Sequence, residues 1–364
     1  MTGPAPALAR LVEQVQDARR ARSALDIVGG GSKRFYGEAP RGVPLATCEL
    51  AGISSYEPAE LVVTARAGTP LAELEAALAA EGQYLPFEPP RFGAHGTVGG
   101  MVAAGLAGPA RAAAGSVRDH VLGVTMLDGR GELLCFGGRV IKNVAGYDVS
   151  RLLAGSLGVL GVICEVSLKV MPVLPASTTL RFGLDERTAL ARLNEWGGRP
   201  LPLRASSWCD GTLRVRLAGA RAAVDDAVRS LGGAVVEPVL AAAYWTGLRD
   251  QHDEFFGAAR AAVAQGAALW RLSLPPSGAP LGLSGRQLIE WGGAQRWLYG
   301  GAPAADVRGA AAAAGGHATL YLAEDRSAGV FTALSSVLAR IHRELKAAFD
   351  PDRVFNPGRL YPGL

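Results

Sequence analysis

Glycine-rich turns between residues 89 and 172 constrain this fold more than any other feature of the sequence. Glycine reaches positive φ angles and allows another backbone or a ligand to come close. The segments at 121–126 and 161–173 are rich in β-branched residues and predict strands. We therefore expect glycine loops at strand ends, forming a cradle of backbone N–H groups for an anion such as phosphate. The turns are HGTVGG at 95–100, GSVRD at 115–119, KNVAGYD at 142–148 and GSLGVLG at 155–161.

Another glycine loop follows the first predicted strand. Residues 8–22 have the apolar spacing of an amphipathic helix, and 25–28 predict a short buried strand. The run at 29–33 reads GGGSK, and its consecutive N–H groups could hold a diphosphate or simply form a tight turn. It matches neither the dinucleotide-binding GxGxxG motif nor the P-loop motif GxxxxGK[ST]. Two anion-favouring loops, at 29–33 and 96–100, suit an elongated ligand with several charged groups better than a single phosphate.

Strands and helices alternate up to residue 175, after which the glycine loops become sparse. In the first part we expect strands at 44–50 and 61–67, and a helix from Thr69, as N-cap, to about residue 80. DGRG at 128–131 predicts a hairpin turn. Later segments predict a hairpin about Asp210-Gly211 and helices at 244–262 and 331–349. The mixture indicates an α+β fold, for which we expect three parts: residues 1–175, 176–325 and 326–364.

Composition excludes several classes of function. The 364 residues carry a net charge of +4, without a dense block of Lys and Arg, so we expect no nucleic-acid partner. No long uncharged apolar run occurs, so we expect no membrane span, no signal peptide and a cytoplasmic location. Four cysteines lie far apart and no CxxC occurs, so we expect no zinc or iron–sulfur ligation in this chain. Cys135 and Cys164 lie in apolar strand patterns and should be buried.

The order of the motifs carries a family resemblance. GGGS, GTVGG, GSVRDHVLG, DGRG, KNVAGYD and GSLGVLGVI follow one another, and DPDRVFNPGR comes at 350–359. This order resembles the vanillyl-alcohol-oxidase, or PCMH-type, FAD-binding family, and within it the FAD-binding E subunits of bacterial glycolate oxidase (glycolate dehydrogenase). The resemblance implies a PCMH-type FAD-binding domain of two α/β subdomains, an α+β cap domain, and a C-terminal segment that returns to the FAD domain.

The same resemblance implies which residues bind FAD. The family's usual covalent attachment site falls in the first glycine loop, where this chain has Ser32 and Lys33, so the resemblance implies noncovalent FAD. His95 lies in a loop and is expected to be structural rather than a ligand. The resemblance identifies no catalytic residue and no metal ligand. The implied cofactor-binding residues are Gly29, Gly30, Gly31, Ser32, Lys33, Gly96, Thr97, Val98, Gly99, Gly100, Ser116, Arg118, Asp119, Lys142, Gly158, Gly161 and Ile163.

Several of these assignments leave alternatives open. Lys142 and Tyr147 could approach the flavin, or remain in solvent and in packing contacts. Arg118 and Asp119 could pair with each other instead of touching FAD. In the cap, four arginines could bind a substrate carboxylate, although alternation at 214 and 216 favours the solvent face of a strand. These four are Arg204, Arg214, Arg216 and Arg271.

The resemblance implies oxidation of a small 2-hydroxy acid, glycolate, to the 2-oxo acid. Electrons would pass through FAD to an iron–sulfur partner subunit, beside a second FAD-containing catalytic subunit. Those partners could bring the chain to the inner face of the membrane. Two other hypotheses remain: a stand-alone FAD-dependent oxidoreductase of hydroxy acids or alcohols, and a noncatalytic scaffold with a vestigial nucleotide fold.

Overall fold

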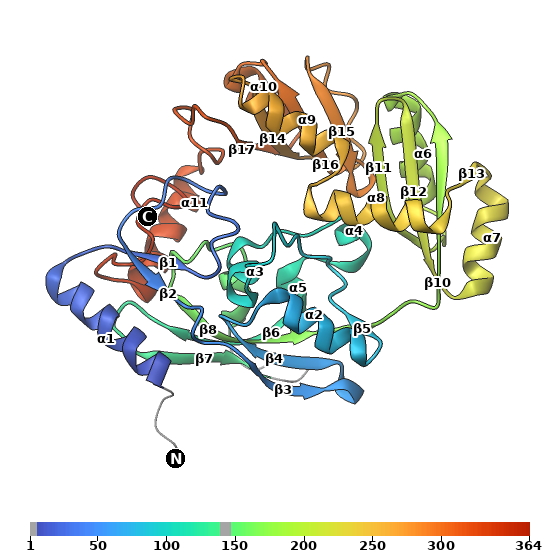
Figure 1. The fold of residues 1–364 in the computed structure, drawn as a ribbon. Coiled ribbons are helices and arrows are strands. Elements are labelled where there is room, and N and C mark those ends of the chain that lie inside the picture. Colours follow the sequence, from blue (N-terminus) through green and yellow to red (C-terminus); the bar gives the residue numbers. More distant parts are fainter. Residues whose placement is uncertain (1–5, 139–146) are drawn as a thin grey trace.

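The N-terminal half of the molecule is built on one antiparallel sheet. The computed structural model describes residues 6–138 and 147–364. Within them, this sheet has the strand order β3-β4-β8-β6-β7 (Figure 1). The DGRG turn joins β6 to β7 as predicted, because the Asp128 carboxylate accepts from the N–H groups of Arg130 and Glu132. The strands are β3 (Ile53–Glu57), β4 (Val62–Arg66), β6 (Val121–Leu127), β7 (Leu133–Gly137) and β8 (Val162–Lys169).

Two helices cover one face of this sheet. Helix α2 (Leu71–Ala80) buries Leu74 and Leu78, and α3 (Val98–Ala104) buries Met101, all in one apolar cluster with the sheet. Short elements connect these parts. They are η1 (Pro58–Glu60), β5 (Gln83–Tyr84), α4 (Arg111–Ala114), α5 (Val117–His120), η2 (Ser150–Leu153) and β9 (Met171–Pro172).

A smaller unit contains the first glycine loop. Strands β1 (Leu25–Val28) and β2 (Val43–Ala46) pair in parallel. Helix α1 (Pro6–Ala21) packs Leu11 and Val15 into an apolar cluster with β1, β2, the far side of β8 and Phe355 near the C-terminus. The predicted two α/β subdomains thus appear as this unit and the larger sheet with its helices. The cleft described below lies between them.

The cap is organised by a larger antiparallel sheet. In the described part of the chain its strand order is β13-β10-β12-β11-β15-β16-β14-β17 (Figure 1). Its strands are β10 (Ala176–Gly183), β11 (Leu203–Cys209), β12 (Thr212–Gly219), β13 (Ala234–Val235), β14 (Ala268–Ser273), β15 (Arg286–Glu290), β16 (Gln295–Gly300) and β17 (His317–Leu322). Its helices are α6 (Glu186–Gly197), α7 (Arg221–Leu231), α8 (Pro238–Asp250), α9 (Glu254–Val263), η3 (Trp291–Gly293) and α10 (Ala304–Ala313).

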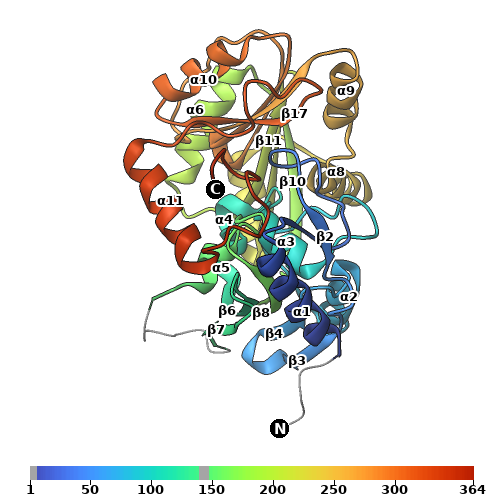
Figure 2. The same cartoon turned by 90° about the vertical axis from the view of Figure 1, so that its left-hand side faces the viewer.

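The C-terminal segment returns to the N-terminal half, as predicted. Helix α11 (Ser336–Phe349) leads back from the cap (Figures 1 and 2). Near its end, the buried Lys346 ammonium lies 2.6 Å from the Asp350 carboxylate and donates to the carbonyls of Val159 and Phe355, each at 2.7 Å. Asp350 also accepts from the N–H of Val354 at 3.0 Å. These bonds fix the tail against the turn that precedes β8.

Several predicted elements were wrong in detail. The expected helix at 244–262 is two helices, α8 and α9, because Gln251 adopts a left-handed conformation (φ 57°) and Asp253 caps α9. Pro70, not Thr69, is the N-cap of α2, since the Thr69 hydroxyl bonds Gly52 instead. The last helix begins at Ser336, five residues later than expected, with Ser335 as its cap. Cys135 is exposed on β7, whereas Cys164 is buried as predicted.

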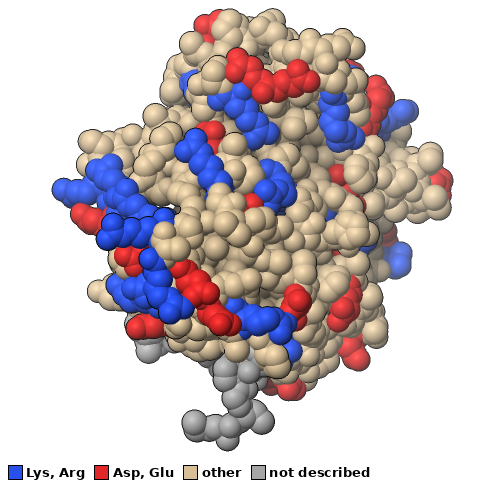
Figure 3. All heavy atoms as spheres, turned by 60° about the vertical axis from the view of Figure 1, so that its left-hand side comes forward, with Lys and Arg blue, Asp and Glu red and all other residues tan. Residues whose placement is uncertain are grey.

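Surface charges of both signs are intermixed. Figure 3 shows one face, on which Lys and Arg side chains gather at one side beside Asp and Glu side chains. Exposed ion pairs such as Arg19–Asp352, with 2.8 Å between Nε and Oδ2, contribute little to stability. Across residues 6–138 and 147–364, no helix combines the length and apolar character that crossing a bilayer requires.

Candidate functional site

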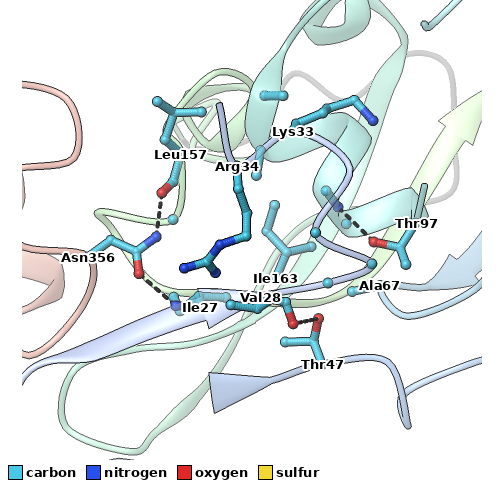
Figure 4. A pocket seen from close by; sticks show the side chains of 18 of the residues that line it. Ile27, Val28, Lys33, Arg34, Thr47, Ala67, Thr97, Leu157, Ile163 and Asn356 are labelled. Carbon is cyan, nitrogen blue, oxygen red and sulfur yellow. Dashed lines mark hydrogen bonds between the residues drawn. The ribbon is translucent and has the colours of Figure 1, made fainter. Parts of the chain in front are cut away.

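An open cleft lies where β1, the loop before α3, the turn before β8 and the C-terminal tail meet (Figure 4). It encloses about 800 Å³ of empty space, part of it open to solvent. Residues far apart in the sequence therefore converge on one hollow, as the glycine motifs predict. The predicted residues that line it are Gly29, Gly30, Gly31, Ser32, Lys33, Thr97, Gly99, Gly100, Gly158, Gly161 and Ile163.

The two glycine loops lie in direct contact. A Cβ atom on Gly30 would lie 1.4 Å from the carbonyl oxygen of His95, and one on Gly29 would lie 2.4 Å from Thr97 Oγ1. Gly99 is equally constrained, since its Cβ would lie 2.6 Å from the Cβ of Ala67. Side chains at these positions would force the backbones apart. Glycine is thus required here by the approach of one backbone to another.

The loops differ in what they offer a ligand. The N–H groups of Val98, Gly99 and Gly100 already donate within the chain, to Thr69 O, Ala67 O and Thr97 Oγ1. The expectation that these N–H groups would face an anion is therefore wrong, and this loop contributes shape. By contrast, the N–H groups at 30–32 have no hydrogen-bond partner among the described residues. Free donors at the end of β1 are suited to phosphate oxygens.

Two tail residues complete the cleft, and sequence reasoning did not assign them to it. The Asn356 side chain accepts from the N–H of Ile27 at 2.7 Å and donates to the carbonyl of Leu157 at 2.6 Å (Figure 4). It thereby joins β1 to the turn before β8. Arg359 lines the same end of the cleft. The only signal in the sequence was the motif DPDRVFNPGR, which contains both residues.

Cationic side chains enter the cleft from the loop after β1. The Arg34 guanidinium reaches its middle in Figure 4, 2.7 Å from the Asp26 carboxylate. Burial lowers the pKa of Lys33 to about 8, against the opposing charge of Asp250. The Lys33 ammonium lies 5.6 Å from the ring centre of Phe92. The cleft is therefore more favourable to an anion than the modest net charge of the chain suggests.

The remaining predicted residues lie elsewhere. Ser116 and Asp119 form a capping box, with Ser116 N and Oγ each donating to Asp119 Oδ2 at 2.8 Å. Burial alone would raise the pKa of Asp119, but these two hydrogen bonds hold it below its usual range. Arg118 lines a separate groove beside α11. Val98 is buried in the core, and Gly96 lies beside Ser32 and Lys33 without lining the cleft. Lys142 lies outside the described residues.

Three of the four cap arginines contact the N-terminal half. Arg216 lies 2.6 Å from the Glu88 carboxylate, and Arg204 donates to the Tyr84 hydroxyl at 2.6 Å. The side chain of Arg216 is only 15% exposed, so the prediction of a solvent-facing position was wrong. Arg214 is half-buried, with its guanidinium 4.4 Å from the ring centre of Tyr244. Arg271 likewise reaches across to the Tyr36 hydroxyl at 3.4 Å.

Comparison with known proteins identifies the family. The FAD binding domain family matches residues 8–137, which include both glycine loops. The chain is 46% identical to "Glycolate oxidase subunit GlcE" of Escherichia coli over 97% of each chain. The chain belongs to the GlcE family of glycolate oxidase subunits. This family membership agrees with the resemblance carried by the glycine motifs.

Other relatives match part of the chain. "Glycolate oxidase subunit GlcD" of Bacillus subtilis is 29% identical over 42% of this chain and 33% of its own length. "D-lactate dehydrogenase" of Anaerostipes hadrus is 35% identical over 36% of this chain and 27% of its own length. Among solved structures, alkyldihydroxyacetonephosphate synthase has a TM-score of 0.61 at 15% identity, covering 96% of this chain and 74% of that one. That structural likeness shows the fold.

FAD is the cofactor of this domain, and the cleft fits it. The free N–H groups at 30–32 are suited to its diphosphate, and glycine at Gly30 lets the loop that carries them pack directly against the His95 backbone. The cleft also combines polar groups at one end with apolar walls at Ala103, Ala104 and Ile163. A dinucleotide with a charged middle and a flat apolar ring matches this division.

Proposed function

We propose that this chain is the FAD-binding subunit of a glycolate oxidase, or glycolate dehydrogenase, complex. The complex oxidises glycolate to glyoxylate and passes the electrons through FAD to an iron–sulfur partner subunit. The observation that carries the proposal is 46% identity with a glycolate oxidase subunit over 97% of both chains. The convergence of residues 29–32 with Thr97, Gly99 and Gly100 on one cleft supports it independently.

FAD is held noncovalently in this proposal. The predicted residues at 29–33, 158, 161 and 163 surround it, with the free N–H groups at 30–32 at its diphosphate. None of the described residues that line the cleft is a His or Cys, the types that attach FAD covalently in this fold family. The bound FAD supplies the redox chemistry, and the chain supplies binding and orientation. Asn356 keeps the walls of the cleft together through its bonds to Ile27 and Leu157.

The partners we propose are a second FAD-containing catalytic subunit and an iron–sulfur subunit. The four cysteines of this chain lie far apart in the sequence, which favours a separate protein as carrier of the iron–sulfur centre. The cap arginines 204, 216 and 271 are engaged with Tyr84, Glu88 and Tyr36. Because these arginines already have partners within the chain, we place substrate oxidation on the partner subunit. We place the complex in the cytoplasm, attached to the inner face of the membrane through the partners.

We also propose the division into an FAD-binding domain (1–175), a cap (176–325) and a returning segment (326–364). The first strand of the cap sheet begins at Ala176, which supports the first boundary. The contacts of Lys346, Asn356 and Arg359 with the N-terminal half support treating the tail as part of the FAD site.

The experiment is purification of the tagged chain from its native cells, both in its complex and alone. Flavin absorbance is followed after addition of glycolate, with D-lactate as a comparison substrate. We expect the complex to reduce a dye acceptor with glycolate, and the chain alone to retain FAD without comparable turnover. Robust turnover by the chain alone would favour a stand-alone hydroxy-acid oxidoreductase. A chain that carries no flavin, and cannot be loaded with it, would favour a scaffold.

A further inference from the structure

The side chain of Arg359 has one nitrogen for which the described residues provide no partner. The residue is 7% exposed and lines the cleft, and its Nη2 donates to the carbonyl of Arg34 at 2.8 Å. Its Nη1 is buried and has no hydrogen-bond partner among the described residues. A buried donor on a charged group is costly without an acceptor. A ligand in the cleft is the natural source of that acceptor.

The electrostatic surroundings favour an anionic acceptor. Burial lowers the pKa of Arg359 to about 10, and Asp26 only partly opposes this effect. Arg34 reaches into the same cleft and is already paired with Asp26. Two guanidinium groups and one carboxylate leave one positive charge at this end of the cleft. A diphosphate brings negative charge and several acceptor oxygens to such a position.

A purely structural role for Arg359 predicts something different. Arg326 shows what that role looks like, because its Nη1 and Nη2 donate to the carbonyls of Gly37 and Phe35, each at 2.8 Å. Arg326 thus clamps the same loop that Arg359 touches, from outside the cleft, and both nitrogens are satisfied. Arg359 makes one such bond and keeps Nη1 without a partner. Arg326 is therefore a matched control for the loop-clamping function.

We propose that Arg359 and Arg34 together bind the diphosphate of FAD, so that the C-terminal tail contributes directly to cofactor binding. The proposal rests on the proposed function only in taking FAD as the ligand. The diphosphate then lies between the free N–H groups at 30–32 and the two guanidinium groups. Arg359 comes from the tail and Arg34 from the loop after β1, so FAD binding and docking of the tail stabilise each other.

The test is titration of the flavin-free full chain with FAD and, separately, with ADP, which carries the diphosphate without the flavin. The R359Q variant loses a charge-assisted hydrogen bond, so its affinity for FAD should be about 10- to 100-fold lower than that of the unmodified chain. R359K should recover part of the loss, because it keeps the charge. R326Q should bind FAD as the unmodified chain does. ADP affinity should fall by the same factor as FAD affinity in R359Q.

Three results would overturn the inference. R359Q could bind FAD as tightly as the unmodified chain, or R326Q could lose as much affinity as R359Q, which would indicate loop clamping. Loss of FAD affinity with unchanged ADP affinity would place Arg359 at the flavin ring. If R359Q does not fold, R34Q decides by the same FAD and ADP titrations. Failure of the unmodified chain to bind FAD would instead contradict the proposed function.

Discussion

Arginine side chains occur both in the cleft and in the interface beneath the cap, but their partners differ. Under the cap, Arg216 pairs with Glu88 and Arg204 donates to Tyr84, so the protein itself supplies the acceptors. In the cleft, Arg359 keeps a buried nitrogen without a partner among the described residues, and the N–H groups at 30–32 are equally free. Arg216 Nε beneath the cap is also buried without a partner among the described residues, so the cleft is distinguished by combining an unpartnered arginine nitrogen with the row of free N–H groups at 30–32.

Two glycines, one in each region, differ in how closely other atoms approach them. At the cleft, Gly30 is required because a Cβ would lie 1.4 Å from the His95 carbonyl oxygen. In the cap, a Cβ on Gly183 would have no atom within 4 Å. Glycine at 183 is therefore replaceable, whereas glycine at 30 is required by the approach of two loops. Such close approaches also occur in the cap, where a Cβ on Gly316 would lie 2.1 Å from the Ser273 carbonyl oxygen, so the free N–H groups rather than the glycines mark the part that binds a ligand.

The largest effect should come from a substitution that forces the two loops apart. Gly30→Ala or Gly30→Val places a Cβ against the His95 carbonyl, so the loops must separate and the chain should be purified without FAD. Absorbance of the purified protein measures retained flavin, and circular dichroism shows whether it is folded. Gly183→Ala is the matched control and should keep its full flavin content. A folded Gly30→Ala protein with full FAD would show that the loops can separate without affecting the cofactor.

The next effect concerns the tail that completes the cleft. Lys346→Met leaves the Asp350 carboxylate buried without its cation, which should lower the free energy of unfolding by about 3–5 kcal/mol. Chemical denaturation measures this change. Glu344→Gln is the control, because Arg340–Glu344 has the same spacing on the same helix but is largely exposed, and it should cost less than about 1 kcal/mol. Equal effects of both variants would mean that the tail pair does not act as a buried one.

In the cap, Glu290 should make the free energy of unfolding depend on pH. Burial raises the pKa of Glu290 from 4.5 to about 7, although Trp297 and Gln295 donate to its carboxylate. The folded chain then binds this proton more tightly than the unfolded chain does. Its contribution to stability is full below pH 4.5 and is lost as the pH rises to about 7. A pKa shift of this size corresponds to about 3 kcal/mol in the free energy of unfolding.

The Glu290→Gln variant tests this assignment. Its amide does not titrate, so the free energy of unfolding should decline less across that pH window than in the unmodified chain. Glu254→Gln, at a highly exposed position, should leave the decline unchanged. Identical pH profiles for Glu290→Gln and the unmodified chain would assign the decline to other groups.

The smallest effect should come from the interface arginine. Arg216→Met removes the ion pair with Glu88, whose carboxylate keeps the N–H of Ala110 as a donor. We expect a loss of about 1–2 kcal/mol in the free energy of unfolding and unchanged FAD affinity. Denaturation and FAD titration of the same preparation measure both quantities. A fall in FAD affinity as large as that of R359Q would remove the distinction between cleft and interface.

Local patterns predicted much of the fold. β1 has the expected bounds, and the DGRG hairpin forms as predicted because its signals lie within a few residues. The break between α8 and α9 was missed, although Asp253 is a good N-cap residue and its carboxylate does accept from Phe256 N–H. The apolar spacing on both sides of the break is similar, and it concealed the change of direction.

Long-range contacts were beyond sequence reasoning. Asn356 and Arg359 meet residues more than 300 positions earlier, Ile27 and Arg34, and no local pattern encodes those distances. Likewise, nothing in the sequence shows that the N–H groups at 98–100 are used within the chain. The motifs located the cleft, whereas the division of donors between its two loops required the structure.

Noncovalent FAD in the cleft is tested best by measuring the FAD released from the purified chain on denaturation. We expect one FAD per chain, all of it in the supernatant after the protein is precipitated, and none from folded Gly30→Ala. Flavin that remains on the precipitated chain would contradict noncovalent binding. A folded chain that carries no FAD and cannot be loaded with it would contradict the assignment of the cleft.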